Sequence, residues 1–386
     1  MGQNFWNPQT LQSRLRCFVV ATVGLVSCLV AMPVIAVTNY TATPLGSLGG
    51  TNSEGHAINS SGQVTGVSLT TGDAAYRAFL YSGGSMINLG TLGGNFYSEG
   101  LGINDSGQVA GRSSTTGKTG IYAFLYSGGT MIDLGTLGGA GSIGFGVNNS
   151  GQVTGTADTG GAVRHPFLYS GGTMTDLGTL GGAYGEARGI NNIGQVTGYS
   201  ATNTTDHAFL YSGGTMIDLG TLGGTSSIGF GVNNSGQVTG SAYTTGNSGV
   251  HAFLYTGGTM TDLGTLGGTS SEGHGINNYG QVVGRAMTTG SGEHAFLYSD
   301  GTMFDLNTLV TEGLGGATLH EASGINDSGQ IVANGCGPST CQAYRLDPIA
   351  GPAAITPVPM LSRTALGAMA LLLLASGLLI RDRPIR

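Results

Sequence analysis

Five glutamates recur at one position of an internal repeat in this 386-residue chain. Carboxylates that converge repel one another unless a cation or a basic ligand group lies between them. Their oxygens suit calcium, which takes about six to eight oxygen ligands. The sequence therefore predicts either a site for calcium or a basic group, or five separate solvated side chains. The five are Glu54, Glu99, Glu186, Glu272 and Glu321, each four residues before an Ile-Asn pair, and Ile143 and Ile228 replace glutamate in two further copies.

Other recurring polar residues predict structural roles. A histidine precedes Ala-Phe or Pro-Phe in four copies, and an aspartate precedes leucine in five. One such residue per sheet leaves them too far apart to share a metal ion, so we expect hydrogen bonds at strand ends. The seven asparagines from Asn59 onward and the seven glutamines from Gln63 onward are interpreted in the same way, as turn and inter-strand residues. The sets are His165, His207, His251 and His294, and Asp133, Asp176, Asp218, Asp262 and Asp305.

The elements that position these residues repeat with a fixed period. The triplet Phe-Leu-Tyr returns every 42 to 45 residues, and a degenerate seventh version lies at residues 343–346. Within residues 272–306, two pairs of alternating segments flank Asn278-Tyr279-Gly280 and Asp300-Gly301, which are hairpin turn signals. Each copy is therefore two hairpins, or four strands. The triplets begin at Phe79, Phe124, Phe167, Phe209, Phe253 and Phe296.

Seven four-stranded copies predict an all-β fold, a seven-bladed β-propeller spanning residues 37–347. A solenoid is the lesser alternative, because its coils are usually shorter, about 20 to 30 residues. The last copy stops after its third strand, and residues 40–45 resemble the missing fourth. We therefore expect the N-terminal strand to close the ring, which removes two open sheet edges. No catalytic-triad, P-loop or dinucleotide-binding motif is present in the sequence.

The connection between second and third strands varies in length, as in residues 201–207 against 243–251. In an antiparallel blade this connection opens on the same face as the link between blades. That face is the candidate binding face.

The two ends predict export. Residues 1–36 have two arginines before a long apolar run and small residues at the end, as in a signal peptide. A cut at Cys28, as in a lipoprotein, is the alternative. Residues 348–363 form a linker, and residues 364–386 predict a C-terminal transmembrane helix with a basic tail. In an oxidising exterior, Cys336 and Cys341 are expected to form a local disulfide. The net charge of −7 and a single lysine argue against nucleic acid as a partner.

The stretch His207–Gly224, "HAFLYSGGTMIDLGTLGG", resembles the HAF family of bacterial extracellular repeats, and the likeness extends from Tyr40 to Asp347. Arg77, Tyr122 and Gln342 depart from the family's histidine, and Pro166 departs from its alanine. The resemblance implies an exported repeat protein and no established substrate.

The tail resembles C-terminal sorting signals of the PEP-CTERM and IPTL-CTERM kind. Val358, Pro359, Met360 and Leu361 stand where that signal has Ile-Pro-Thr-Leu, and Met360 departs from it. The likeness implies an exosortase-like sorting enzyme as a partner. The alternative is a plain membrane anchor that is never cut.

These features together predict a non-enzymatic module of the cell envelope. We expect it on the outer surface or secreted after processing, binding extracellular polysaccharide or a surface protein, or displayed there. No cofactor other than calcium is expected. The alternatives are an envelope hydrolase or lyase that uses carboxylates at the channel mouth, and a matrix component in which the repeats only provide bulk.

Overall fold

The computed structural model describes residues 38–117, 120–161, 163–290 and 292–349. The predicted signal peptide, the sorting motif Val358–Leu361 and the predicted C-terminal helix lie outside these residues. Within them, no helix is both long enough and apolar enough to cross a membrane.

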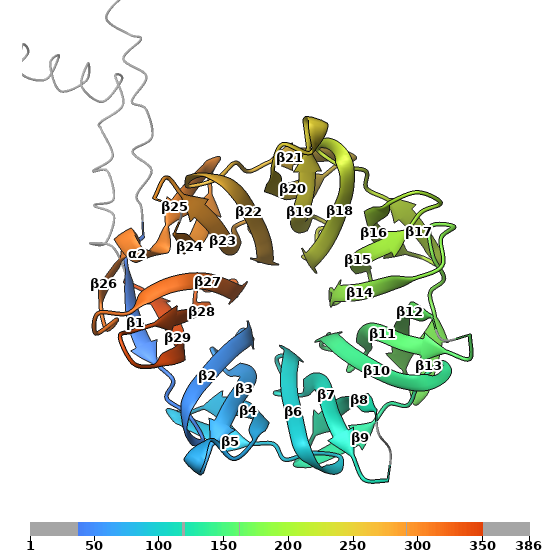
Figure 1. Cartoon of the computed structure of the whole chain (residues 1–386), viewed down its shortest axis with the longest axis horizontal. Helices are drawn as coiled ribbons and strands as arrows, with labels where there is room; N and C mark the ends of the chain where they lie inside the picture. Colours follow the sequence, from blue (N-terminus) through green and yellow to red (C-terminus); the bar gives the residue numbers. More distant parts are fainter. Residues whose placement is uncertain (1–37, 118–119, 162, 291, 350–386) are drawn as a thin grey trace, which may run out of the picture. The chain divides into compact units, whose positions relative to one another are not determined.

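The described residues form antiparallel sheets arranged around a centre (Figure 1). The innermost strands are β2 (Gly49–Ile58), β6 (Gly93–Ile103), β10 (Gly138–Val147), β14 (Gly185–Ile190), β18 (Gly223–Val232), β22 (Gly267–Ile276) and β27 (Thr318–Ile325). Each is followed by a second strand: β3 (Val64–Thr70), β7 (Val109–Thr115), β11 (Val153–Thr159), β15 (Val196–Ala201), β19 (Val238–Thr244), β23 (Val282–Thr288) and β28 (Ile331–Cys336).

The third and fourth strands complete each sheet outward. The third are β4 (Tyr76–Ser82), β8 (Ile121–Ser127), β12 (Arg164–Ser170), β16 (Asp206–Ser212), β20 (Val250–Thr256), β24 (Glu293–Ser299) and β29 (Cys341–Pro348). The fourth are β5 (Ser85–Asn88), β9 (Thr130–Asp133), β13 (Thr173–Asp176), β17 (Thr215–Asp218), β21 (Thr259–Asp262) and β25 (Thr302–Asp305). Two short 3-10 turns, Thr71–Asp73 and Thr245–Asn247, lie in variable connections. The predicted all-β class is confirmed.

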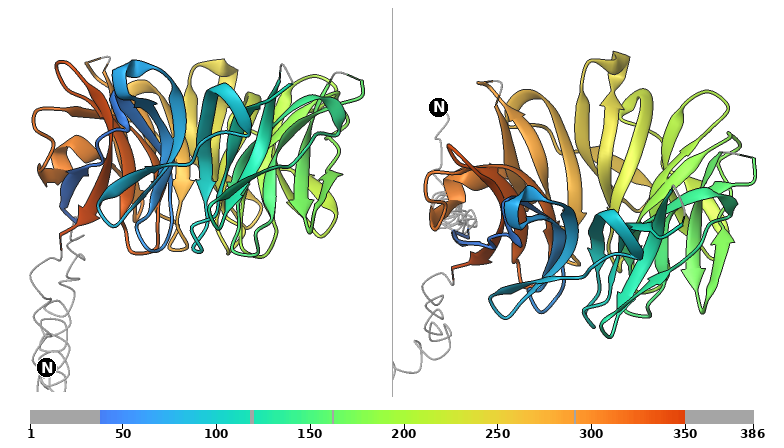
Figure 2. Two further views of the ribbon diagram at one scale, coloured as in Figure 1. Left: turned by 90° about the horizontal axis from the view of Figure 1, so that it is seen from below. Right: turned by 60° about the horizontal axis from the view of Figure 1, so that its bottom comes forward.

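Turn chemistry places the hairpins where the sequence predicts them. Asp300 and Gly301 both have positive φ, 51° and 83°, as the two-residue turn requires. At the other hairpin of the same repeat, Gly280 has φ 77°. These turns hold the four strands of each repeat side by side, and Figure 2 shows the strands running between two faces of loops.

A buried phenylalanine forms the centre of each complete repeat. Phe79 has no exposed surface, and neither have its counterparts in the next five repeats. Its ring packs against Gly66, where a Cβ atom would lie 2.9 Å from the ring and 1.9 Å from the carbonyl oxygen of Glu54. Only glycine fits in this close approach, which explains the recurring Val-Thr-Gly of the second strand.

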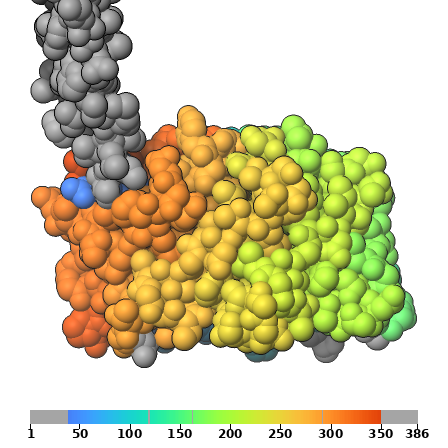
Figure 3. Space-filling model, turned by 90° about the horizontal axis from the view of Figure 1, so that it is seen from above, coloured from blue at the N-terminus to red at the C-terminus, as the bar shows by residue number. Residues whose placement is uncertain are grey.

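Serine side chains join neighbouring repeats. Ser98 Oγ accepts a hydrogen bond from Ala78 N at 3.0 Å and donates one to Gly90 O. Each such serine is buried. Its oxygen accepts from an alanine N–H that makes no hydrogen bond within the alanine's own sheet, so this buried donor is satisfied. Figure 3 shows the outer side, where repeats of the second half of the chain lie against one another. Within the described residues, the same bond recurs at Ala123–Ser142, Ala208–Ser227, Ala252–Ser271 and Ala343–Ser53.

The chain's first strand pairs with its last. β1 (Tyr40–Pro44) is antiparallel to β29, with Tyr40 opposite Pro348 and Pro44 opposite Tyr344. Two features here were not expected from the sequence: the helix α2 (Leu306–Leu309), and β26 (Val310–Glu312), which pairs in parallel with β1. They bury Leu306 and Leu309 in the same apolar cluster as Tyr40.

The two cysteines that the sequence predicts to pair are joined by a disulfide. Cys336 ends β28 and Cys341 begins β29, and the two residues lie opposite each other in the sheet. The bridge closes the variable connection of the last repeat.

Candidate functional site

The innermost strands surround a central channel with two different mouths. One mouth, here the variable-loop mouth, lies toward the starts of these strands and encloses about 560 Å³. The channel then narrows between Ile58, Ile103, Ile190 and their counterparts. The other, here the asparagine mouth, lies at the turns that follow the innermost strands and encloses about 240 Å³.

The asparagine mouth is held by hydrogen bonds that use each amide fully. Asn59 Nδ2 donates to Gln63 Oε1 and to Asn104 O, and its Oδ1 accepts from Ser61 N and Gln63 N. The next asparagine repeats the pattern, and Asn326 Nδ2 donates to Asn59 O at 2.9 Å. The structural role predicted for these asparagines and glutamines is confirmed. The asparagines are Asn59, Asn104, Asn148, Asn191, Asn233, Asn277 and Asn326.

The recurring histidines and aspartates pair within each repeat, near the outer strand. His207 Nδ1 lies 2.8 Å from Asp218 Oδ2, and Asp218 Oδ1 accepts from Gly220 N. His165–Asp176, His251–Asp262 and His294–Asp305 have the same geometry. They hold strand ends together, as predicted.

The five glutamates occupy four different environments. Glu54 is exposed, and Glu99 is buried at 6% exposure. Glu186 lines a separate cleft between repeats. Only Glu272 and Glu321 line the variable-loop mouth.

Glu99 is held by three side chains. Its carboxylate lies 2.9 Å from His56 Nε2, forms an ion pair with Arg112 and accepts a hydrogen bond from Tyr97 Oη at 2.6 Å. Burial alone would raise the pKa of Glu99, but His56, Arg112 and Tyr97 outweigh burial and lower it to about 2. This carboxylate is therefore ionised and fully engaged.

Glu272 and Glu321 share one histidine. His274 Nδ1 lies 2.9 Å from Glu321 Oε1, and its Nε2 lies 3.3 Å from Glu272 Oε2. Burial lowers the pKa of His274, but the hydrogen bonds to both carboxylates outweigh it and raise the pKa to about 9. The pKa of Glu321 falls to about 2 because His274 outweighs the effect of burial. Arg285 adds a second cation, 3.0 Å from Glu272.

Arg188 is enclosed by aromatic rings. Its Cζ lies 5.3 Å from the ring centre of Phe145 and 5.1 Å from that of Phe230, and Nη2 lies 3.1 Å from Glu186 Oε2. The phenylalanines come from the preceding and following repeats. A guanidinium between two ring faces is stabilised by cation–π attraction.

The five glutamates therefore neither converge at one mouth nor remain five separate solvated side chains. Glu99, Glu186, Glu272 and Glu321 each have an arginine or histidine within ion-pair distance. Within the described residues, no group of three or more His, Cys, Asp or Glu side chains is placed to hold a metal ion. The negative field that was expected to attract calcium is cancelled by side chains of the protein itself.

Each repeat contributes to the lining of the variable-loop mouth the residue two positions after the glutamate position. These residues differ from repeat to repeat, whereas asparagine occupies the other mouth in all seven. A search for residues that recur does not find this column, because its informative feature is that it varies. Its members are His56, Leu101, Phe145, Arg188, Phe230, His274 and Ser323.

Two buried nitrogens of this mouth lack an aligned hydrogen-bond partner. Among the described residues, Arg188 Nε and His56 Nε2 are the buried side-chain polar atoms in this condition. His56 Nε2 still faces Glu99 as an ion pair, so Arg188 Nε is the stronger case. Buried polar atoms without partners are uncommon and often lie at functional sites.

No protein-family model and no curated protein matches the chain. Solved structures with similar folds share little sequence identity with it. A puromycin-hydrolyzing peptidase from Mycobacterium tuberculosis is 9% identical over 81% of this chain and 56% of that chain, with a TM-score of 0.50. TolB from Acinetobacter baumannii is 14% identical over 75% and 64%, with a TM-score of 0.44. The WD40 β-propeller domain of Doa1 is 13% identical over 78% and 96%, with a TM-score of 0.46.

The aligned part spans less than two thirds of the peptidase and TolB chains. At such identities the likeness shows the fold alone. The chain is an all-β protein of propeller type, and the activities named for these relatives belong to them.

Proposed function

We propose that this protein is an exported, non-catalytic binding module of the cell envelope, a closed seven-bladed propeller that takes its ligand at the variable-loop mouth. Two features support closure. β1 supplies a fourth strand to β27, β28 and β29, and the asparagine hydrogen bonds return from Asn326 to Asn59. Export follows from the character of the two ends of the sequence.

One observation carries the assignment to the variable-loop mouth. The channel-facing residues there differ in every neighbouring pair of repeats, and the unpartnered Arg188 Nε belongs to this set. A repeated scaffold needs the same residue in each copy for structural bonds, as at the asparagine mouth. Side chains that differ from copy to copy form one asymmetric surface, which is what recognition of a ligand requires.

The chemistry of the mouth favours a ligand rich in oxygen acceptors. Arg188, His274 and Arg285 bring N–H donors to the lining of the mouth. Phe145 and Phe230 add apolar ring surface. A sugar unit carries hydroxyl or carboxylate oxygens together with apolar C–H faces. We therefore propose an extracellular polysaccharide as the ligand, and a surface protein as the alternative partner.

The paired carboxylates count against a hydrolase. A glycosidase needs one carboxylic acid with a raised pKa that protonates the leaving oxygen. Here the pKa values of Glu99, Glu272 and Glu321 are all lowered, because histidine and arginine hold these carboxylates ionised. The mouth therefore supplies bound anions rather than a proton donor.

The test is polysaccharide binding by the full-length protein, measured by isothermal titration with dextran, xylan, cellulose and alginate. We expect Arg188→Met and Phe230→Ala to weaken the binding of a recognised polymer at least tenfold. Arg77→Met is the matched control, because Arg77 bonds the backbone oxygens of Tyr76 and Asn95 away from the channel. Unchanged affinity of both mouth variants would refute the assignment, and release of reducing ends from a bound polymer would show an enzyme instead.

A further inference from the structure

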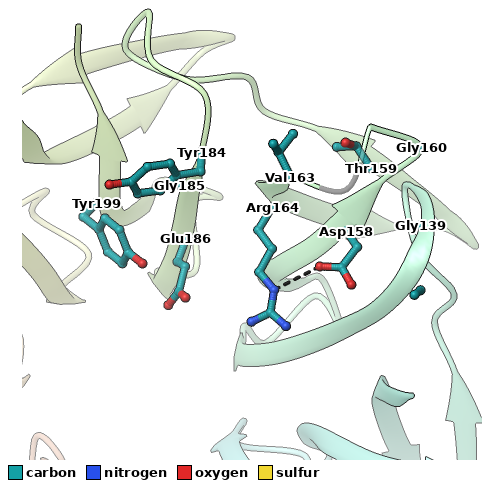
Figure 4. A pocket seen from close by; sticks show the side chains of 11 residues that line it. Gly139, Asp158, Thr159, Gly160, Val163, Arg164, Tyr184, Gly185, Glu186 and Tyr199 are labelled. Atoms are coloured by element: carbon teal, nitrogen blue, oxygen red, sulfur yellow. Dashed lines mark hydrogen bonds and ion pairs between the residues drawn. The ribbon is translucent and has the colours of Figure 1, made fainter. Parts of the chain in front are cut away.

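A wide cleft lies between the third and fourth repeats. It encloses about 760 Å³. Tyr184, Tyr199 and Glu186 lie on one side of it, and the ion pair between Arg164 and Asp158 lies on the other (Figure 4). The cleft opens beside the second-to-third-strand connection, on the face of the variable-loop mouth.

Two substitutions in the repeat pattern remove the bond that closes this junction elsewhere. The third repeat has Pro166 where the others have alanine, so no N–H is available. The fourth repeat has Gly185 where five others have the joining serine, so no hydroxyl is available. The N–H donor and the hydroxyl acceptor of this bond are both absent. Neither substitution therefore leaves the other group of the pair buried and unpaired.

The fourth repeat also has a shorter innermost strand. β14 begins at Gly185, whereas β18 in the next repeat begins at Gly223, at the Gly-Gly pair that corresponds to Gly181-Gly182. The adjoining variable connection is short as well: His207 follows Val196 by eleven positions, whereas His251 follows Val238 by thirteen. The fourth repeat therefore differs from the next one in strand length and in loop length as well as in the joining bond.

Charges in the cleft are matched by partners within the protein. Asp158 pairs with Arg164 at 2.9 Å, Glu186 pairs with Arg188 at 3.1 Å, and Tyr184 Oη donates to Asp206 Oδ2 at 3.2 Å. With its acids compensated, the cleft has no net field that would select a cationic or an anionic ligand. The ligand that fits is uncharged.

The tyrosines determine what kind of uncharged ligand fits. The side chain of Tyr184 is 43% exposed, and burial raises the pKa of Tyr199 to about 12, so its hydroxyl keeps its proton. Rings with hydroxyl groups offer an apolar face and a hydrogen-bonding edge at low entropic cost. Opposite them, the Arg164–Asp158 ion pair offers donors and acceptors to hydroxyl groups, and Glu186 adds a carboxylate beside the tyrosines.

We propose that the cleft between the third and fourth repeats binds a neutral saccharide unit, stacked on Tyr184 and Tyr199 and hydrogen-bonded to Glu186 and the Arg164–Asp158 pair. The cleft adjoins the variable-loop mouth, since Tyr199 lies 5.9 Å from Arg188 Cζ and Glu186 bonds the same guanidinium. One polysaccharide chain can therefore occupy both. The inference rests on the proposed function for its ligand class.

The test uses the full-length protein and hexasaccharides of glucose (malto- and cello-), xylose, mannose and N-acetylglucosamine, with affinities from isothermal titration. We expect at least one to bind, and Tyr184→Ala and Tyr199→Ala to weaken it at least tenfold. Tyr279→Ala is the control, because Tyr279 is 76% exposed in a turn at the asparagine mouth. Tyr184 is exposed and its loss leaves the core intact, so this variant reports on the cleft even where Tyr199→Ala reduces stability.

The outcomes separate this inference from the proposed function. Equal affinity of both tyrosine variants and the wild type overturns the cleft, even if Arg188→Met and Phe230→Ala weaken binding. Loss in the tyrosine variants alone, with the mouth variants unchanged, supports the cleft and refutes the mouth. The cleft is also refuted if no hexasaccharide binds, or if a pentalysine peptide binds there instead.

Discussion

His274 is the clearest case of a side chain whose role depends on its neighbours. It comes from the sixth repeat, and its two ring nitrogens face Glu272 of the same repeat and Glu321 of the next. Arg285, from β23, forms an ion pair with the carboxylate of Glu272. A charged histidine between two carboxylates joins two repeats, at the cost of removing all three from water.

We expect the stability contributed by His274 to depend on pH. Its folded pKa, about 9, lies above the ordinary 6.5, so its contribution is complete below pH 6.5 and is lost as the pH rises through 9. His274→Gln should therefore cost roughly 2 kcal/mol at pH 6 and progressively less toward pH 9. Urea unfolding of both proteins at pH 6, 7, 8 and 9 measures the difference. A difference that stays constant over this range would contradict the charged histidine.

At the scale of the strands, one buried serine joins neighbouring repeats at five junctions. The alanine N–H that donates to this serine points to the next repeat rather than to a strand of the alanine's own sheet. Pro166 can therefore occupy an interior strand without loss of a ladder hydrogen bond. Pro166 and Gly185 together replace this bond at the junction where the cleft lies.

Ser227→Ala tests the joining bond. The substitution leaves Ala208 N buried without a partner, because Ser227 Oγ accepts from it at 2.8 Å, and should lower the free energy of unfolding by about 1–3 kcal/mol. Ser235→Ala, in an exposed turn of the same repeat, should change it by less than about 0.5 kcal/mol. Chemical denaturation of the two variants measures both. Equal effects would mean that the serine bond does not stabilise the junction.

At the scale of the whole molecule, stability depends on the contact between the two ends of the repeat region. β1 lies between β29 and β26, and Tyr40 and Ala42 are buried in the cluster that contains Leu306 and Leu346. Strands 300 residues apart in sequence thus share one sheet. Such contacts form only after the conformational entropy of closing a long loop has been lost.

Deletion of residues 38–45 should expose one edge of β29 and empty part of this cluster. We expect a lower melting temperature and self-association through the exposed edge, since unpaired strands bind other strands. Thermal melting and size-exclusion chromatography measure the two effects. Tyr76→Ala, which removes a tyrosine that is 45% exposed, serves as a control that should leave both unchanged. A deleted protein that melts at the wild-type temperature and remains monomeric would refute closure by β1.

The sequence alone determined the strands, their turns and their repetition. Hairpin turns depend on residues next to one another, such as Asp300-Gly301, and strand faces depend on alternation, so local sequence is sufficient. The cysteine pair is likewise local, since five positions separate Cys336 and Cys341. The helix α2 and the strand β26 were not predicted, because they pack on β1 from the far end of the repeat region.

Only the tertiary structure decided which side chains meet. Glu99 pairs with His56, and Glu321 with His274, across the gap between neighbouring sheets, 43 and 47 positions apart. Whether such residues touch depends on how closely and at what angle two sheets pack, which no local pattern encodes. The five glutamates share one column in the sequence, yet one is exposed, one is buried and three lie in two different cavities. Glu99 and Glu321 have histidine partners from adjacent repeats. At the cleft, Pro166 and Gly185 replace both partners of the bond that joins other repeats.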